Sequence, residues 1–354
     1  MKKLSHLSRV LLNVALVLTA LVAFRFLPLS AAPVPAPDTV MLNGAGASFP
    51  YPIYAKWFSD YNKLHSDIQI NYQSIGSGGG IRQLLSGTVD FGASDAPMND
   101  EQLSQVKTKI LHFPTVLGAV VPSYNVPGLS KELDFTPDVL ADIYLGKITK
   151  WNDPAIAKSN KGVNLPAQDI VVVHRSDASG TSYVWTDYLS KVSKEWESKL
   201  GKNTAVNWPV GLGGKGNEGV TGLVKQTPGA IGYVELIYAL QNQVPFGRVQ
   251  NSAGVFLKAD LAGVTAAAAG FAKTIPADFR VSITNAPGKA SYPICSFTYL
   301  LVPTTIPDAN KMRVIKDFLN WMLSDGQNDT EALSYARLPK EVVAKELKQI
   351  SEIQ

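Results

Sequence analysis

Short apolar runs alternate with longer amphipathic segments along most of the chain. Residues 68–72, 89–93, 170–174 and 230–234 are apolar runs in which β-branched and aromatic residues recur, and this pattern predicts strands. Residues 170–174 read Ile-Val-Val-Val-His, a continuous run that is typical of a strand buried on both faces. The alternation predicts an α/β architecture with parallel sheets, and the length of 354 residues predicts two domains.

The segments between these runs show the apolar spacing of helices. Ile53, Trp57, Tyr61 and Leu64 would form one apolar face, and proline at positions 50 and 52 suits the first turn of such a helix. Near the C-terminus, residues 312–323 and 339–350 are amphipathic in the same way. We expect these helices to pack their apolar faces against a sheet.

Three of the predicted helices begin in the same manner, with glycines and a hydroxyl residue at the start. The segments are G-A-G-A-S-F-P at 44–50, G-S-G-G-G at 76–80 and H-R-S-D-A-S-G-T-S at 174–182. Any one of them alone is typical of an ordinary helix N-cap. Helix N-termini also attract anions, so three such starts in one chain favour convergence on a single anion.

The third segment carries the most specific chemistry. Arg175 offers a rigid fork of donors that suits a tetrahedral oxyanion. Ser179, Gly180 and Thr181 add hydroxyl and backbone N–H donors where a helix begins. Because glycine has no Cβ, the backbone at residue 180 can approach a ligand closely.

A carboxylate belongs to the same hypothesis. Asp95 follows the predicted strand 89–93 in a turn bounded by glycine and proline, where an Asx turn or a helix cap is the ordinary interpretation. Beside a bound anion the carboxylate would repel it, unless the anion carries a proton to donate. Phosphate carries one at physiological pH and sulfate does not, so this residue would select between them.

The first 32 residues have the features of a secretory signal peptide. Four basic residues (Lys2, Lys3, Arg9 and Arg25) flank a mostly apolar stretch, and small residues precede a cleavage site expected after Ala32. Without this leader the chain has 33 − 4 = 29 basic and 29 acidic residues, so its formal charge is zero. The basic pI of the whole chain therefore gives no reason to expect nucleic-acid binding.

The cysteine count limits the redox and anchoring options. Cys295 is the single cysteine, so no intrachain disulfide can form, and its strand-like surroundings predict a small buried side chain. No cysteine lies near the expected cleavage site, which excludes lipid attachment there. We expect a freely diffusing periplasmic protein.

The sequence lacks the residue patterns that a metal-dependent or a dinucleotide-dependent enzyme would need. The histidines beyond the leader, His65, His112 and His174, are far apart and do not have zinc-ligand spacing. His174 could orient the neighbouring arginine, but a structural role is the ordinary interpretation. Residues 211–216 match G-x-G-x-x-G, with Glu235 about twenty residues further on. The preceding segment 206–210 is short and contains a proline, so a loop is the better interpretation than a dinucleotide site.

Taken together, the motifs resemble those of the PstS family of periplasmic phosphate-binding proteins of ABC importers. The resemblance covers nearly the whole chain after the leader. The remaining motifs that carry it are Y-Q-S-I-G-S-G-G-G, T-V-D-F-G-A-S-D-A-P, D-I-Y-L-G-K-I-T-K-W-N-D, W-P-V-G-L-G-G-K-G-N and P-G-A-I-G-Y-V-E.

The resemblance implies a set of ligand residues. The implied phosphate-binding positions are Ser48, Phe49 (through its N–H), Ser77, Asp95, Arg175, Ser179, Gly180 and Thr181. Asp177 is implied as the partner that tempers the charge of the arginine. Many members have threonine at position 48 and serine at position 78, and some have arginine at position 174, so the charge around this cleft can differ.

The resemblance also implies a fold and a task. The fold would be the two-lobed periplasmic-binding-protein fold (type II), with a ligand cleft between lobes joined by hinge strands. Residues 33–114 and 291–354 would form lobe I, and 115–290 lobe II. The protein would capture inorganic phosphate and deliver it to transmembrane permease subunits of an ABC transporter, as a monomer without catalysis, cofactor, metal or nucleic acid.

Two alternatives remain open at this stage. The same fold could serve another oxyanion, such as sulfate, arsenate or molybdate; Asp95 argues against sulfate, whereas arsenate also carries a proton. A secreted phosphatase would need a nucleophile with a base or a metal, and the chain offers no convincing pair.

Overall fold

The computed structural model describes residues 39–129, 131–272 and 274–354, so the predicted signal peptide lies outside the described residues. Residues 40–354 form one compact unit. Its strands are β1 (Val40–Gly46), β2 (Ile68–Ser74), β3 (Phe91–Ser94), β4 (Ile110–Asn125), β5 (Asp134–Phe135), β6 (Val171–Arg175), β7 (Leu212–Gly214), β8 (Ala230–Glu235), β9 (Arg248–Gln250), β10 (Phe256–Leu257) and β11 (Cys295–Pro303).

Helices connect most of these strands. They are α2 (Tyr51–Leu64), α3 (Ser77–Leu85), α4 (Asp100–Ser104), α5 (Pro137–Tyr144), α6 (Pro154–Ser159), α7 (Gly180–Val192), α8 (Lys194–Lys199), α9 (Gly216–Gln226), α10 (Leu236–Gln241), α11 (Leu261–Ala269), α12 (Ala309–Leu323) and α13 (Lys340–Gln349), with the 3-10 turns η1 (Asp325–Asp329), η2 (Glu331–Leu333) and η3 (Ile350–Glu352). Within the described ranges, none of the helices has the length and apolarity needed to cross a bilayer.

Eight strands form one mixed sheet in the order β2-β1-β3-β11-β4-β8-β6-β7, and β10-β9-β5 form a small second sheet. We call β2, β1, β3 and β11 the β1 half of the large sheet, and β8, β6 and β7 the β6 half. Pairing is parallel among β1, β2 and β3 and among β6, β7 and β8.

The prediction of parallel sheets is wrong for the middle of the large sheet. Strand β11 runs antiparallel to both β3 and β4, and β4 runs antiparallel to β8. Chain direction at these strands depends on long-range connections, and an apolar run carries no information about the direction of its partner.

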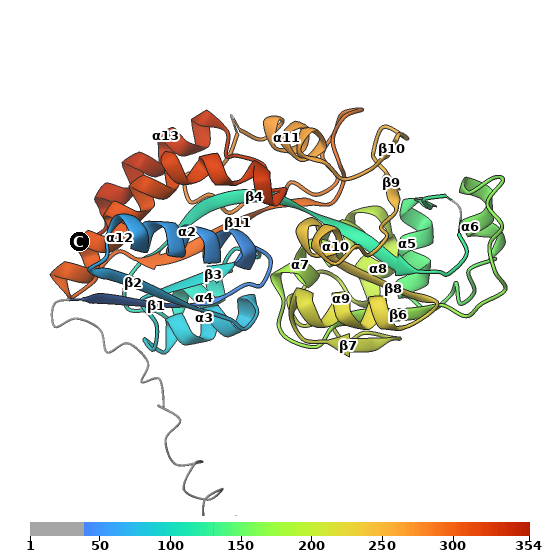
Figure 1. Cartoon of the computed structure of the whole chain (residues 1–354), viewed down its shortest axis with the longest axis horizontal. Coiled ribbons are helices and arrows are strands. Elements are labelled where there is room, and N and C mark those ends of the chain that lie inside the picture. The colour runs from blue at the N-terminus through green and yellow to red at the C-terminus, as the bar shows by residue number, and fades with distance from the viewer. Residues whose placement is uncertain (1–38, 130, 273) are drawn as a thin grey trace, which may run out of the picture. The chain divides into compact units, whose positions relative to one another are not determined.

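Strand β4 belongs to both halves of the sheet (Figure 1). Its residues Ile110–Ala119 pair with β11, and Val120–Asn125 pair with β8. Nearly the whole strand is buried, so its backbone joins the two halves inside the protein rather than through an exposed linker.

Most of the predicted elements are present. Three of the four predicted strands begin within one residue of the expected position, and the strand predicted at 89–93 begins two residues later, at Phe91. Helix α2 buries Ile53, Trp57 and Tyr61 as expected, whereas Leu64, its last residue, is 63% exposed. The α/β fold class is confirmed by this architecture.

Candidate functional site

Two of the three glycine-rich helix starts differ from ordinary N-caps in the use of their hydroxyls. The N-cap of α2 is Pro50 and that of α3 is Gly76, and neither has a side-chain capping bond. Ser48 lies two residues before the N-cap of α2, and Ser77 is the first residue of α3. Neither hydroxyl is used for capping. Only the α7 start follows the ordinary pattern, because Ser179 Oγ accepts the N–H of Ser182 at 3.0 Å.

The α3 start, the end of β3 and the α7 start meet closely. The Asp95 N–H donates to Ser77 Oγ at 3.2 Å. A Cβ on Gly180 would lie 2.3 Å from Ser77 Oγ and 2.4 Å from Asp95 Oδ2, so a side chain at residue 180 would collide with both. The N–H of Gly78 also donates to the carbonyl of Ala178 at 2.9 Å, which connects α3 to the α7 start.

Asp95 is held in a dry environment. Its residue is 1% exposed, Oδ1 accepts the Thr298 hydroxyl at 2.8 Å, and Oδ2 has no hydrogen-bond partner among the described residues. Burial raises the pKa of Asp95 to about 7, against the opposing effects of the Thr298 bond, the Arg175 charge and the Ser77 hydroxyl. The Asx-turn interpretation does not describe this carboxylate, because its partner is on β11, 203 residues away.

Arg175, at the end of β6, forms a two-point ion pair with Asp177. The guanidinium Nε donates to Oδ1 at 2.8 Å and Nη2 to Oδ2 at 2.5 Å, while Nη1 donates to Thr181 Oγ1 at 3.3 Å. Burial alone would raise the pKa of Asp177, but the arginine and the N–H of Gly216 outweigh it and hold the pKa below the usual value. The arginine side chain is 1% exposed.

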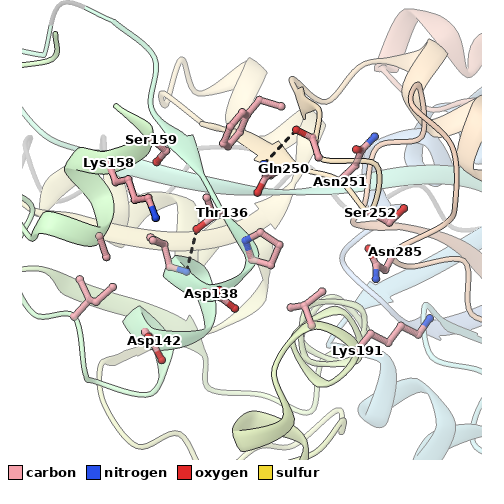
Figure 2. A pocket seen from close by; sticks show the side chains of 17 residues that line it. Thr136, Asp138, Asp142, Lys158, Ser159, Lys191, Gln250, Asn251, Ser252 and Asn285 are labelled. Atoms are coloured by element: carbon pink, nitrogen blue, oxygen red, sulfur yellow. Dashed lines mark hydrogen bonds between the residues drawn. The ribbon is translucent and has the colours of Figure 1, made fainter. Parts of the chain in front are cut away.

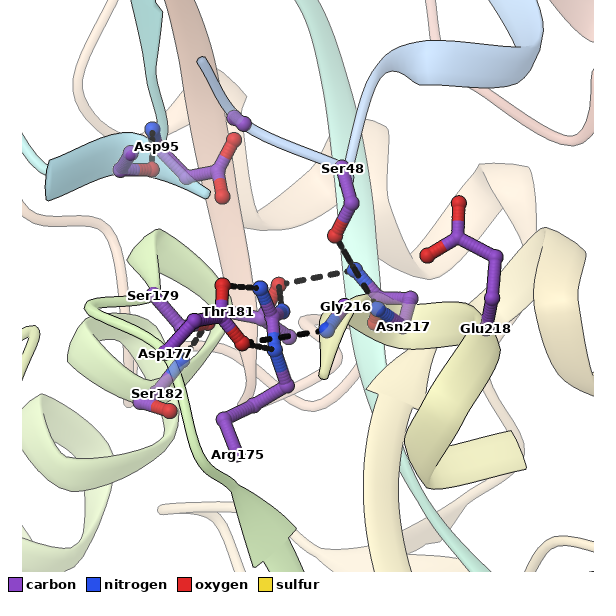
Figure 3. A network of polar contacts seen from close by, with 12 residues as sticks. Ser48, Asp95, Arg175, Asp177, Ser179, Thr181, Ser182, Gly216, Asn217 and Glu218 are labelled. Carbon is purple, nitrogen blue, oxygen red and sulfur yellow. Dashed lines mark hydrogen bonds and ion pairs between the residues drawn. The ribbon is translucent and has the colours of Figure 1, made fainter. Parts of the chain in front are cut away.

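Ser48 connects the β1 half of the sheet to this cluster (Figure 3). Its Oγ accepts the backbone N–H of Asn217 at 3.1 Å and the Nδ2 of the same residue at 2.9 Å. Its carbonyl accepts the Tyr238 hydroxyl at 2.6 Å. The next residue, Phe49, is fully buried, and its carbonyl accepts the Tyr335 hydroxyl at 2.6 Å.

The structure therefore brings the predicted residues of both halves into one buried cluster. Within the part of the chain that the structure describes, no group of three or more acidic, histidine or cysteine side chains is arranged to hold a metal ion. The cluster combines one guanidinium, several hydroxyls and one carboxylate oxygen without a partner, which is a set suited to a protonated oxyanion.

A separate pocket of about 860 Å³ lies away from the cluster (Figure 2). Thr136, Asp138, Lys158 and Asn251 are among its lining residues, and none of the predicted ligand residues lines it. Lys191, one of the lining residues, is already paired with Asp187 at 3.2 Å. The pocket does not repeat the oxyanion arrangement.

Comparisons with known proteins show the family of this chain. The model of the PBP superfamily domain matches residues 33–326. The phosphate-binding protein PstS of Pasteurella multocida is 47% identical over 305 residues, which are 86% of this chain and 88% of that protein. The chain belongs to the PstS family. The PstS of Xylella fastidiosa is 45% identical, over 86% of this chain and 83% of that protein.

Solved structures support the two-lobed fold of this PstS family member. A high affinity periplasmic phosphate-binding protein (PfluDING), solved with bound phosphate, superposes with a TM-score of 0.70 at 21% identity. The match covers 87% of this chain and 93% of that one. At this identity the likeness shows the fold alone, which is the two-lobed fold expected from the motifs.

Reasoning from the sequence missed two residues of the PstS cluster. Thr298 holds Asp95 from β11, and no local pattern connects residues so far apart. Asn217 is the second residue of α9 and follows the glycine run 211–216, for which the prediction of a loop is wrong in part because Leu212–Gly214 form β7. This run has the same form as the three recognised helix starts, glycines followed by a polar residue and a helix, so the signal was present.

The neighbouring histidine has a structural role. The ring of His174 stacks on Trp208, with 5.1 Å between the ring centres, and Nδ1 lies 3.0 Å from the Arg175 carbonyl oxygen. It contacts the backbone of the arginine, not the guanidinium. Cys295 is fully buried, with its Sγ 3.2 Å from the Tyr292 carbonyl, as expected for a small buried side chain.

Proposed function

We propose that this protein captures inorganic phosphate and delivers it to the permease subunits of an ABC transporter. The observation that carries the proposal is Asp95 Oδ2, a buried acceptor without a partner among the described residues, next to the donors Ser77 and Gly180. Such an oxygen suits an anion that brings its own proton. The PstS relatives are named for phosphate binding, which supports the same ligand.

We assign the binding roles as follows. Ser48, Ser77, Ser179 and Thr181 would supply hydroxyl donors, Phe49 and Gly180 backbone N–H donors, Arg175 the positive charge and Asp95 the acceptor. No protein group within the described residues accepts the N–H of Phe49, which supports its assignment. Asp177 would partly neutralise the charge of Arg175 and hold its guanidinium in place.

The two lobes would be residues 33–114 with 291–354, and 115–290. The change of partner along β4, from β11 to β8 between Ala119 and Val120, supports a crossing near this point. Closure about this crossing would exclude water from the anion and present one shape to the permease. In this scheme the protein acts in the periplasm as a monomer, binds without catalysing a reaction, and has no nucleic-acid partner.

Calorimetric titration with phosphate, arsenate and sulfate in turn tests the proposal. Phosphate and arsenate should bind tightly, since both carry a proton at neutral pH, and sulfate should bind much more weakly. Equal binding of sulfate would contradict the role of Asp95. Absence of phosphate binding would contradict the proposed function itself. Hydrolysis of a phosphate ester by metal-stripped protein would instead support the phosphatase alternative.

A further inference from the structure

The side chain of Asn217 connects the two halves of the site. Asn217 is the second residue of α9 and is fully buried. Its Nδ2 donates to Ser48 Oγ at 2.9 Å and to Thr181 Oγ1 at 3.1 Å, so both amide protons point at hydroxyls (Figure 3). One hydroxyl follows β1 and the other lies at the start of α7.

The orientation of this amide is determined by its other end. The backbone N–H of Glu235, the last residue of β8, donates to Asn217 Oδ1 at 2.9 Å. An N–H can only donate, so the amide oxygen must face β8, and the nitrogen must face the two hydroxyls. The strand therefore fixes which end of the amide enters the site.

The hydroxyls of Ser48 and Thr181 each accept two hydrogen bonds from protein donors, so only the hydroxyl proton is available to a ligand. Ser48 Oγ accepts two bonds, both from Asn217, and Thr181 Oγ1 accepts one from Asn217 and one from Arg175. A hydroxyl has two lone pairs and one proton, so both act as acceptors toward the protein. Across the described residues, neither proton is donated to a protein group.

We propose that Asn217 is a positioning residue that sets the hydroxyls of Ser48 and Thr181 as donors to the bound oxyanion. The inference rests on the proposed function, since it needs an anion between these residues. Asn217 occupies both lone pairs of the Ser48 hydroxyl and shares those of Thr181 with Arg175, so this side of the site can only donate and the Asp95 carboxylate is left as the acceptor. A sidechain that linked these hydroxyls by accepting from them would turn their protons away from the ligand.

A merely structural role for Asn217 is the competing explanation. In that case the residue would satisfy the Glu235 N–H and hold α9 against β8, and its loss would act on stability alone. The two explanations differ in whether the effect on binding depends on the Ser48 hydroxyl. A double-mutant cycle measures this dependence directly.

The experiment compares phosphate affinity by calorimetry in the wild type, Asn217→Ala, Ser48→Ala and the double variant. We expect Asn217→Ala to raise the Kd about 10- to 100-fold, since each of the two hydroxyls loses one of the two donors that orient it. In the Ser48→Ala background Asn217→Ala should have a smaller effect: its fold-increase in Kd should be at most about one third of the increase in the wild type. Asn217→Asp, which keeps an oxygen for the Glu235 N–H, provides a second cycle should the alanine variant not fold.

Asn160 supplies the matched control. This asparagine is also buried, its Oδ1 accepts the Asp134 N–H at 2.8 Å, and its Nδ2 donates to the Asp134 and Ile156 carbonyls. Asn160→Ala should lower the melting temperature and leave the phosphate Kd unchanged. Equal effects of Asn217→Ala with and without the Ser48 hydroxyl, or an unchanged Kd, would overturn the positioning role. Failure of the wild type to bind phosphate would overturn the proposed function instead.

Discussion

The regions around Asp95 and Asp177 place the same residue type in opposite surroundings. Asp95 has a single side-chain donor, Thr298, and one oxygen without a partner among the described residues, and burial raises its pKa to about 7. Asp177 is bonded through both oxygens by Arg175 and through one by the Gly216 N–H, and its pKa is lowered.

The difference separates two tasks that one carboxylate could not perform. In the proposed site, Asp177 would act as a fixed negative charge that neutralises most of the guanidinium, so that the site would not become a strong general anion trap. Asp95 keeps a free oxygen and a pKa near neutrality, so it responds to protons on a neighbour.

Removing Arg175 should have the largest effect, since it removes the ion pair with Asp177. In Arg175→Ala the Asp177 carboxylate would lie largely buried without its charge partner, which should lower the free energy of unfolding by about 3 kcal/mol. The phosphate Kd should rise at least about 10-fold, as expected for a lost charged hydrogen bond. Urea denaturation and calorimetry measure the two effects.

Arg248 offers a control with the same geometry at the surface. It forms a two-point pair with Asp134, and its side chain is 44% exposed. Arg248→Ala should change stability by less than about 1 kcal/mol and leave the Kd unchanged. An Arg175→Ala protein that binds phosphate as tightly as the wild type would remove the arginine from the site.

The next effect comes from the contact between the two regions. Gly180→Ala would place a methyl group 2.4 Å from Asp95 Oδ2 and 2.3 Å from Ser77 Oγ, so the helix start must move away. Overpacking usually costs about 1–3 kcal/mol of stability, and because the displaced groups are proposed phosphate ligands, we also expect a loss of phosphate affinity. Calorimetry would measure the loss.

Gly222, inside α9, controls for the loss of glycine flexibility, because a Cβ there meets nothing within 4 Å. Gly222→Ala should stabilise the protein by about 0.5–1 kcal/mol without changing the Kd. If Gly180→Ala bound phosphate normally, the close approach of α7 to Asp95 would have no functional meaning.

The sequence predicted the cluster better than it predicted the sheet. Each helix start was recognisable because glycine, hydroxyl and apolar spacing are local properties. The antiparallel entry of β11 and β4 was not predicted, because it depends on connections more than a hundred residues long. The same limit hid Thr298, which reaches Asp95 only after β11 has returned beside β3.

The pKa difference between the aspartates was also beyond the sequence. Both residues lie in turns rich in small residues, at 92–97 and 176–180, and nothing in these segments tells which carboxylate will be paired. The difference arises from burial and from partners supplied by distant elements: β11 for Asp95, and the α9 start for Asp177. The adjacent Arg175 was the one local clue.

The two aspartates should affect the pH dependence of stability with opposite signs. The folded pKa of Asp95, about 7, exceeds its usual value of 3.8, so its destabilising contribution grows as pH rises from about 4 to 7. Asp95→Asn should remove about 2 kcal/mol of this decline between pH 5 and 7 in the ligand-free protein. The folded pKa of Asp177 is lowered, so its contribution is present above the unfolded pKa and disappears in acid.

Denaturation of the ligand-free protein across this pH range tests the comparison. Asp177→Asn should destabilise the protein at neutral pH, where Asp95→Asn should stabilise it. Parallel shifts of the two variants would show that the carboxylates do not differ in the way described here.

The smallest expected effect concerns selectivity. In Asp95→Asn the amide nitrogen can donate to an anion that has no proton, so the affinity for sulfate should rise relative to that for phosphate. The sulfate Kd divided by the phosphate Kd should fall about 10-fold. In the wild type, sulfate binding should strengthen as pH falls through about 7, because the protonated Asp95 carboxyl becomes a donor. The variant should lack this pH dependence, since its amide does not titrate. Competition titrations at pH 6 and pH 8 measure both effects, and a sulfate affinity that is independent of pH in the wild type would mean that Asp95 does not face the anion.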